Sequence, residues 1–231
     1  TGMKFTLNSQ LQLTSGSTGN VINIATDSTV VSGMWFNGDG EWTLQSDYIM
    51  PMMGMIQIQN GTLNTNGKTI TVGNFMAMGF MGNINLKFGS SVITTNWINF
   101  MGSVQLDAGT STLNIASTNF QGNNLVFYNV NLLPTSPLSQ VFIRGGNTFN
   151  ILTFNKNVSA VFFEDSKTQT LSDLKILASC SKRVLLNSDG VNSTYLKKYS
   201  GLVNLEYLDI KNVNIIGGAT FTANNSVNLG N

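Results

Sequence analysis

The chain has 231 residues, of which 42% are hydrophobic and only 10% are charged, and its formal net charge is +1 at pH 7. This near-neutral balance gives no basic field for a phosphate backbone, so it argues against nucleic-acid binding. One cysteine and no histidine are present, which excludes an internal disulfide and the usual zinc sites. We therefore expect no metal ion and no cofactor.

The surface must be covered largely by small polar residues. The sequence contains 31 Asn, and these, with Ser, Thr and Gly, take the place of Lys and Glu. Such residues are unfavourable inside helices, because their short polar groups compete for backbone hydrogen bonds or leave the backbone too free. No uninterrupted apolar run reaches the roughly 20 residues that span a bilayer. We expect an all-β protein without a membrane span.

Short bursts of alternating apolar and polar residues follow one another along the chain, as in half-buried strands joined by tight turns. In chain order the first six begin at Ile56, Ile70, Ile84, Val104, Leu113 and Leu125. The later six begin at Leu152, Val161, Leu174, Val184, Leu208 and Val213. No burst is long enough to favour a helix.

A repeated motif indicates how these strands are organised. A Gly followed by a small hydroxylated residue and a new strand occurs at Gly61, Gly89 and Gly109, with spacings of 28 and 20 residues. Such spacing is typical of stacked coils. The sequence predicts a right-handed parallel β-helix, a β-solenoid of about ten coils, as one segment over residues 1–231. Inward positions would form columns of Ile, Leu, Val and Phe, and Asn would provide left-handed turn residues.

Pro134 and Pro137 interrupt the alternation, because proline cannot donate to a strand ladder. We expect a loop, and a bend or sub-boundary near residues 133–146. No capping helix is visible at either end, so the end coils would present unpaired strand edges. We expect other parts of a longer parent chain, or surface assembly proteins, to cover these edges, and the chain alone to associate end to end or to fray.

Six segments carry a family resemblance, namely residues 36–44, 61–73, 86–91, 203–210, 217–221 and 224–227. They resemble repetitive β-helical secreted and cell-surface proteins of gliding and other Bacteroidota-type bacteria, which are large, multi-domain and largely uncharacterised. The resemblance implies an extracellular, outer-surface location, type 9 secretion and neighbouring domains, and it brings no active site. The chain departs from the family pattern at seven methionines: Met50, Met52, Met53, Met55, Met76, Met78 and Met81.

Three classes of function fit this scaffold. The first is a non-enzymatic structural or adhesive module, which acts as a rigid stalk or presents a lateral binding face, with glycans as candidate partners. The second is a polysaccharide lyase or hydrolase, which needs at least three acidic or basic side chains that converge in a lateral groove. Its candidates, which we interpret as solvated turn residues, are Asp39, Glu41, Asp47, Glu164, Asp165, Arg144 and Arg183. The third is a bacteriophage fibre or spike segment, which predicts a trimer.

Aromatic and sulfur-containing residues complete the set of candidates. Trp35, Tyr48 and Trp97 are candidate glycan contacts if their rings face outward, whereas Trp42 is expected in the core because it alternates with an inward Leu. The methionines between Met50 and Met81 offer thioethers that suit Cu(I), but we interpret them as packing residues. Cys180 has no histidine to activate it and is expected to be a buried, inert thiol.

Overall fold

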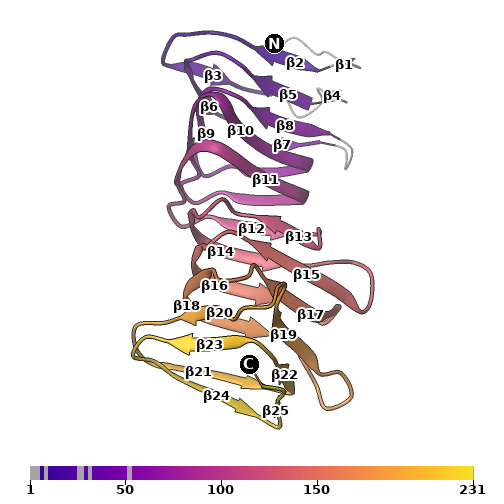
Figure 1. The fold of residues 1–231 in the computed structure, drawn as a ribbon. Helices are drawn as coiled ribbons and strands as arrows, with labels where there is room; N and C mark the ends of the chain where they lie inside the picture. Colours follow the sequence, from indigo (N-terminus) through magenta and orange to yellow (C-terminus); the bar gives the residue numbers. More distant parts are fainter. Residues whose placement is uncertain (1–5, 8–9, 25–28, 31–32, 51–53, 231) are drawn as a thin grey trace. The chain divides into compact units, whose positions relative to one another are not determined.

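The computed structural model describes residues 6–7, 10–24, 29–30, 33–50 and 54–230. These ranges contain strands and no helix, which confirms the predicted all-β class. The chain divides into two compact units, residues 1–114 and 115–231. In each unit parallel strands stack as a β-solenoid, and the two units together have about nine turns, close to the ten predicted (Figure 1).

The strands of the first unit are β1 (Thr6–Leu7), β2 (Leu11–Leu13), β3 (Asn20–Ile22), β4 (Thr29–Val30), β5 (Gly33–Phe36), β6 (Glu41–Leu44), β7 (Tyr48–Ile49), β8 (Met55–Ile58), β9 (Gly61–Asn64), β10 (Thr69–Lys87) and β11 (Val92–Asp107). Strand β12 (Thr112–Ile115) crosses the boundary at residue 114.

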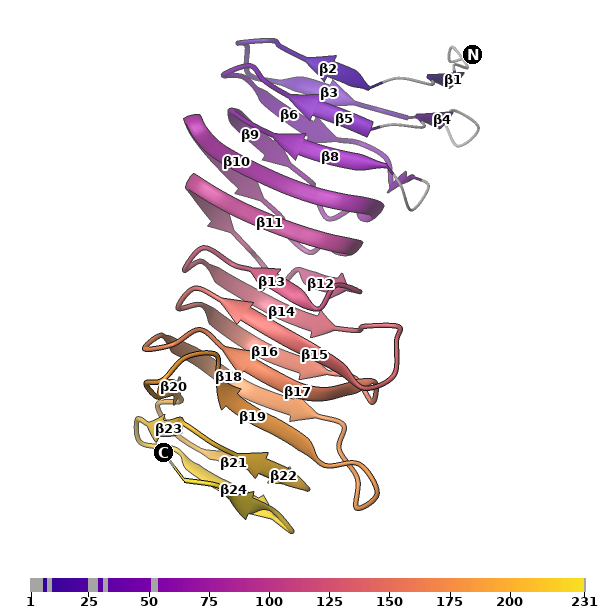
Figure 2. The same cartoon turned by 45° about the vertical axis from the view of Figure 1, so that its right-hand side comes forward.

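Three columns of parallel strands form the sides of the first unit (Figure 2). The first column joins β2, β5 and β8 to residues 74–79 of β10 and 97–102 of β11. The second joins β3, β6 and β9 to residues 84–87 of β10 and 104–107 of β11. The third joins β7 to the first residues of β10, and these to the first residues of β11. Strands β10 and β11 therefore each make one complete coil.

The strands of the second unit are β13 (Asn119–Gln121), β14 (Val126–Leu132), β15 (Ser139–Arg144), β16 (Thr148–Phe154), β17 (Val158–Phe163), β18 (Thr168–Ile176), β19 (Val184–Ser188), β20 (Thr194–Lys197), β21 (Leu202–Glu206), β22 (Leu208–Ile210), β23 (Val213–Ile216), β24 (Thr220–Asn224) and β25 (Val227–Asn228).

Parallel ladders again link successive coils of the second unit. One column runs through β13, β15, β17, β19, β22 and β25. Another runs through β14, β16, β18, β20 and β23. Strands β21 and β24 form a separate parallel pair. A hollow of about 510 Å³ opens where the end of β18 faces β21.

Inward side chains fill each unit and alternate with outward ones, as the sequence predicts. In the first unit Phe75 is fully buried, and its ring meets those of Phe88 and Phe100 edge to face, with centroids 5.7 and 6.2 Å apart. In the second unit the rings of Phe127 and Phe149 stack with centroids 5.8 Å apart. Aromatic side chains of successive coils thus pack on one another inside each solenoid.

The turn residues confirm one part of the predicted repeat and correct another. Gly89 and Gly109 stack at one corner, as expected, but their partner in the preceding coil is Gly67 and not Gly61. Gly61 lies at a different corner, against the carbonyl oxygens of Gly38 and Gly40. The sequence motif grouped Gly61 with Gly89 and Gly109 because a glycine stands at the start of a strand or just before it at both corners. As predicted, Asn supplies left-handed turn residues, namely Asn66, Asn123, Asn124, Asn212 and Asn225.

The proline segment forms the expected loop. Residues 133–138 connect β14 to β15 without strand structure, and Leu138 has a positive φ of 59°. The region 133–146, where the sequence indicates a bend or sub-boundary, lies inside the second unit. Its later part is strand β15 and the start of the following turn.

Candidate binding face

The outward side of the first column in the first unit differs from the rest of the surface. Its inward residues are buried hydrophobic side chains such as Ile56, Phe75 and Phe100. The alternating positions point outward, and we call the side that they form the Trp face. Its members are Gln12, Trp35, Met55, Gln57, Asn74, Met76, Met78, Trp97, Asn99 and Met101. No Asp, Glu, Lys or Arg is among these described outward positions.

Two of the three candidate glycan contacts lie on this face. Trp97 is 36% exposed and pairs in register with Asn74 on the neighbouring strand. Trp35 is half-buried, pairs in register with Gln57, and has an indole Nε1 that is buried without a hydrogen-bond partner in the described part of the chain. The structure therefore brings both Trp residues to one sheet, on strands β5 and β11.

Tyr48 does not belong with them. It points inward, is only 2% exposed, and has a buried hydroxyl without a partner among the described residues. Burial raises the pKa of this hydroxyl above its ordinary value of 10.0. Ile49 takes the outward position instead. The expected glycan contact at Tyr48 is therefore wrong, whereas the core position expected for Trp42 is confirmed by its edge-to-face contact with Phe36, with centroids 5.4 Å apart.

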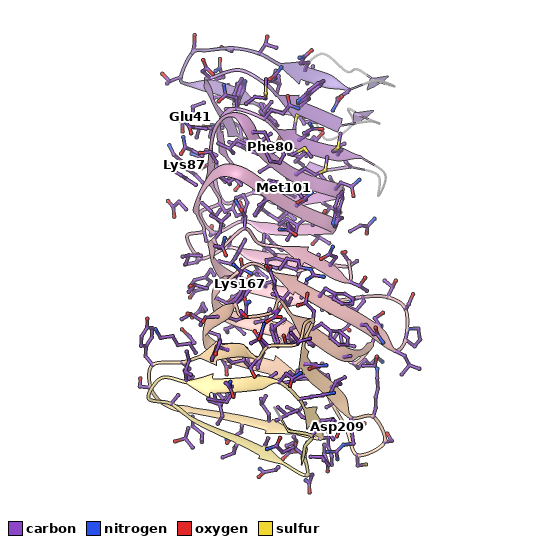
Figure 3. All side chains as sticks on the ribbon, viewed as in Figure 1. Glu41, Phe80, Lys87, Met101, Lys167 and Asp209 are labelled. Atoms are coloured by element: carbon purple, nitrogen blue, oxygen red, sulfur yellow. The ribbon has the colours of Figure 1, made fainter. Side chains whose placement is uncertain are left out.

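The second column of the first unit presents a polar face. Lys87 Nζ and Glu41 Oε1 are 2.9 Å apart, and the two side chains lie side by side in Figure 3. A shallow groove of about 360 Å³ crosses this face, lined by Thr62, Asn85 and Gln105 among others. Lys87, which also lines this groove, is thus already paired with Glu41. Asp107, also in its lining, accepts a hydrogen bond from the backbone of Gly109.

Acidic and basic residues do converge at one corner of the second unit. Arg144 and Asp189 form an ion pair, and the other carboxylate oxygen of Asp189 accepts from the backbone N–H of Asp165 at 2.7 Å. Glu164 accepts from the backbone N–H of Gly145 at 2.6 Å. Asp165 accepts from Ser166 and Asn192, and these bonds, the Ser166 bond first, lower its pKa below the ordinary 3.8. The carboxylates at this corner thus join turns of adjacent coils by hydrogen bonds.

The remaining candidates have mixed outcomes. Cys180 is exposed, which corrects the expectation of a buried thiol, because it lies in a hairpin-like excursion closed by Ser179 and Lys182 outside the stacked coils. Met50 is buried, as a packing residue should be. Met52 and Met53 lie outside the described residues. Met55, Met76 and Met78 instead face outward, and Met81 is 92% exposed.

The outward amides of the Trp face, and Met101, are the residues that sequence reasoning missed. The signal was present in the alternations Phe75-x-Ala77 and Ile98-x-Phe100, which assign the residues between them to the outside. Which of those residues pair across strands depends on the register. The sequence does not reveal this register, because β10 has three more residues than β11 between the pairs Gly79–Gly102 and Ile84–Val104.

Within the described ranges no group of three or more His, Cys, Asp or Glu side chains could hold a metal ion. The same residues include no helix long and apolar enough to cross a membrane. No protein-family model matches the chain, and no curated protein or solved structure is significantly similar to it.

Proposed function

We propose that the chain is a non-enzymatic structural and adhesive module of a bacterial surface or secreted protein, and that its Trp face binds a neutral glycan. The observation that carries this proposal is the outward placement of Trp35 and Trp97 on one sheet whose described outward positions are uncharged. A Trp ring offers a flat apolar surface with a polar edge, which suits the C–H face of a sugar. The amides of Gln57 and Asn74 supply donors and acceptors for hydroxyl groups.

The stalk function follows from how the coils are joined. Each coil is hydrogen-bonded to its neighbours along continuous parallel ladders, so bending a unit would break several backbone hydrogen bonds at once. Such a stack can hold neighbouring domains apart and present a lateral binding face, and neither role needs a moving part. The family resemblance adds the outer surface as the place of action, and other segments of the parent chain as the partners.

An enzyme of the polysaccharide lyase or hydrolase class is less well supported. The corner around Arg144 and Asp189 has the number of charged groups that such an enzyme needs. Its carboxylates, however, accept hydrogen bonds from turn N–H groups and from Asn192, so they are engaged in structure.

The test is affinity electrophoresis of the full chain through gels that contain a mixed-linkage β-glucan, a mannan or a dextran. We expect at least one of these neutral polysaccharides to retard the protein, and Trp97→Ala combined with Trp35→Ala to weaken the apparent affinity about tenfold or more. The matched control is Glu41→Gln with Lys87→Met on the polar face, which should leave the retardation unchanged. Absence of retardation in all three gels, or retardation that survives the loss of both Trp rings, would contradict the proposal.

A further inference from the structure

Four outward side chains of the Trp face occupy neighbouring positions on two adjacent strands. Met76 and Met78 lie on β10, and Asn99 and Met101 lie on β11. Met76 is the register partner of Asn99, and Met78 is the register partner of Met101. Neighbouring strands are about 4.8 Å apart and same-face residues along a strand about 6.6 Å apart. The four side chains therefore rise from the corners of a rectangle small enough for their ends to meet.

Asn99 has an unusual environment within this rectangle. It is only 4% exposed although it points outward, and its Oδ1 has no hydrogen-bond partner in the part of the chain that the structure describes. A buried carbonyl oxygen without a partner is unfavourable, and such atoms in native proteins call for an explanation. The three methionines beside it cannot provide one, because a thioether has no hydrogen to donate.

We propose that Met76, Met78, Met101 and Asn99 form a binding site for a soft monovalent metal ion, Cu(I). Thioether sulfur is a soft, polarizable ligand that selects Cu(I) over the hard cations, and three such groups are available here. The unpaired Oδ1 of Asn99 supplies the fourth donor and is itself satisfied by the positive ion. A single oxygen ligand excludes Ca²⁺, which takes six to eight.

The surroundings of the rectangle fit an ion of low charge. All four donors are neutral groups and the described outward positions of the Trp face carry no charge, so an ion of low charge costs less to bind there than a divalent ion. Phe80 is 66% exposed and Met81 is 92% exposed in the segment that follows Met78. Figure 3 labels Phe80 and Met101 on the neighbouring strands β10 and β11. Met76, Met78 and Met101 are themselves partly exposed, so an ion can reach their sulfur atoms from solvent.

This inference does not rest on glycan binding, and the experiment distinguishes the two. The protein is the full chain with Cys180→Ser, because the exposed thiol would bind the same ions. The chain is labelled at the methionine methyl groups and titrated with Ag(I), and anaerobically with Cu(I) against a chromogenic chelator. We expect one ion per chain, with methyl NMR shifts concentrated at Met76, Met78 and Met101 and small at buried Met34.

The variant Met78→Leu with Met101→Leu keeps the apolar volume and removes two sulfurs, and we expect it to weaken Cu(I) binding at least tenfold. The matched control is Met55→Leu, which changes an outward methionine on β8 outside the rectangle and should leave the affinity unchanged. Loss of binding with an unchanged melting temperature supports the site. No stoichiometric binding, shifts spread evenly over all methionines, or undiminished affinity of the double variant would overturn it.

Discussion

A Cβ atom on Gly109 would lie 2.3 Å from the carbonyl oxygen of Gly89, so these two turns stack only where residue 109 has no side chain. Gly109 also has a φ of 52°, in the left-handed region that strains most L residues. The corner therefore depends on glycine for space and for backbone conformation at the same position.

Gly109→Ala should lower the free energy of unfolding by about 1–3 kcal/mol, since the new methyl group must push two backbones apart. The matched control is Gly16→Ala, because a Cβ there meets nothing within 4 Å and its φ is ordinary. We expect the control to stay within about 0.5 kcal/mol of the wild type. Urea unfolding of both variants measures the difference, and equal effects would contradict the stacked-turn geometry.

Phe75→Ala should be among the costliest single substitutions, because its fully buried ring contacts both Phe88 and Phe100. Truncation of a buried Phe removes apolar burial and leaves a cavity, which costs about 3–5 kcal/mol. Phe80→Ala on the same strand is the control, since its side chain is mostly exposed. Thermal unfolding should separate the two by many degrees; similar melting temperatures would mean that residue 75 does not face the core.

Asp165 should contribute to acid sensitivity. The hydrogen bonds from Ser166 and Asn192 lower its folded-state pKa below 3.8, whereas the unfolded chain keeps the ordinary value. Its stabilising contribution is therefore complete above the ordinary pKa and is lost as the pH falls through the folded pKa. We expect the stability difference between wild type and Asp165→Asn to shrink between about pH 5 and pH 2. A difference that stayed constant over this window would contradict the assignment.

Arg183 connects separate parts of the last coils. Its Nε donates to Asp209 Oδ1 at 2.6 Å, and its two terminal nitrogens donate to the carbonyl oxygens of Asn225 and Leu208 at 2.8 and 2.7 Å. Arg183→Met should accelerate amide hydrogen exchange in residues 207–229 roughly tenfold, because these bonds resist local opening. Lys175→Met is the control, since its contact with Asp173 is long at 3.9 Å and solvent-exposed. Unchanged exchange in the arginine variant would rule out this role.

The last strands of the second unit should promote association. An apolar hollow of about 120 Å³ is lined by Leu205, Val213 and Phe221, and Val227 on β25 is exposed. Exposed strand edges pair with other chains unless charges or proline block them. We expect concentration-dependent association in light scattering, which Val227→Lys reduces and Val126→Lys, on the outward side of β14, does not. A stable monomer with protected terminal amides would contradict this expectation, and a discrete trimer would favour a fibre shaft.

The fold was predictable because alternation reports directly on strands, and the spacing of Gly89 and Gly109 reports on successive coils. Trp42 could be assigned to the core because it alternates with Leu44. The direction of Tyr48 could not be assigned, because the two-residue strand β7 is too short to show an alternation. The two residues that follow Tyr48, Ile49 and Met50, are both apolar and do not show which of them faces the core. Cys180 was misplaced because its segment leaves the coil, and composition does not reveal such an excursion.

The candidate sites were predictable only in part, since they depend on which strands are neighbours. The outward direction of Trp97 follows from the buried Ile98 beside it. A prediction that Trp97 lies on the same sheet as Trp35 would need the lengths of the intervening coils, and these lengths vary at the turns. The pairing of Met78 with Met101 depends in the same way on a register that continues only as far as Gly79 and Gly102 before it shifts.

Disulfide trapping tests the stacking of parallel coils most directly. In a Cys180→Ser background, Thr62→Cys with Asn85→Cys places cysteines on register partners of β9 and β10, with Cα atoms about 4.8 Å apart and within the Cα range of a disulfide. Thr62→Cys with Gln105→Cys places them one coil further apart, at about 9.6 Å. Rapid cross-linking of the first pair and not of the second is the result that stacked coils predict. Cross-linking of the second pair, or of neither, would contradict the solenoid.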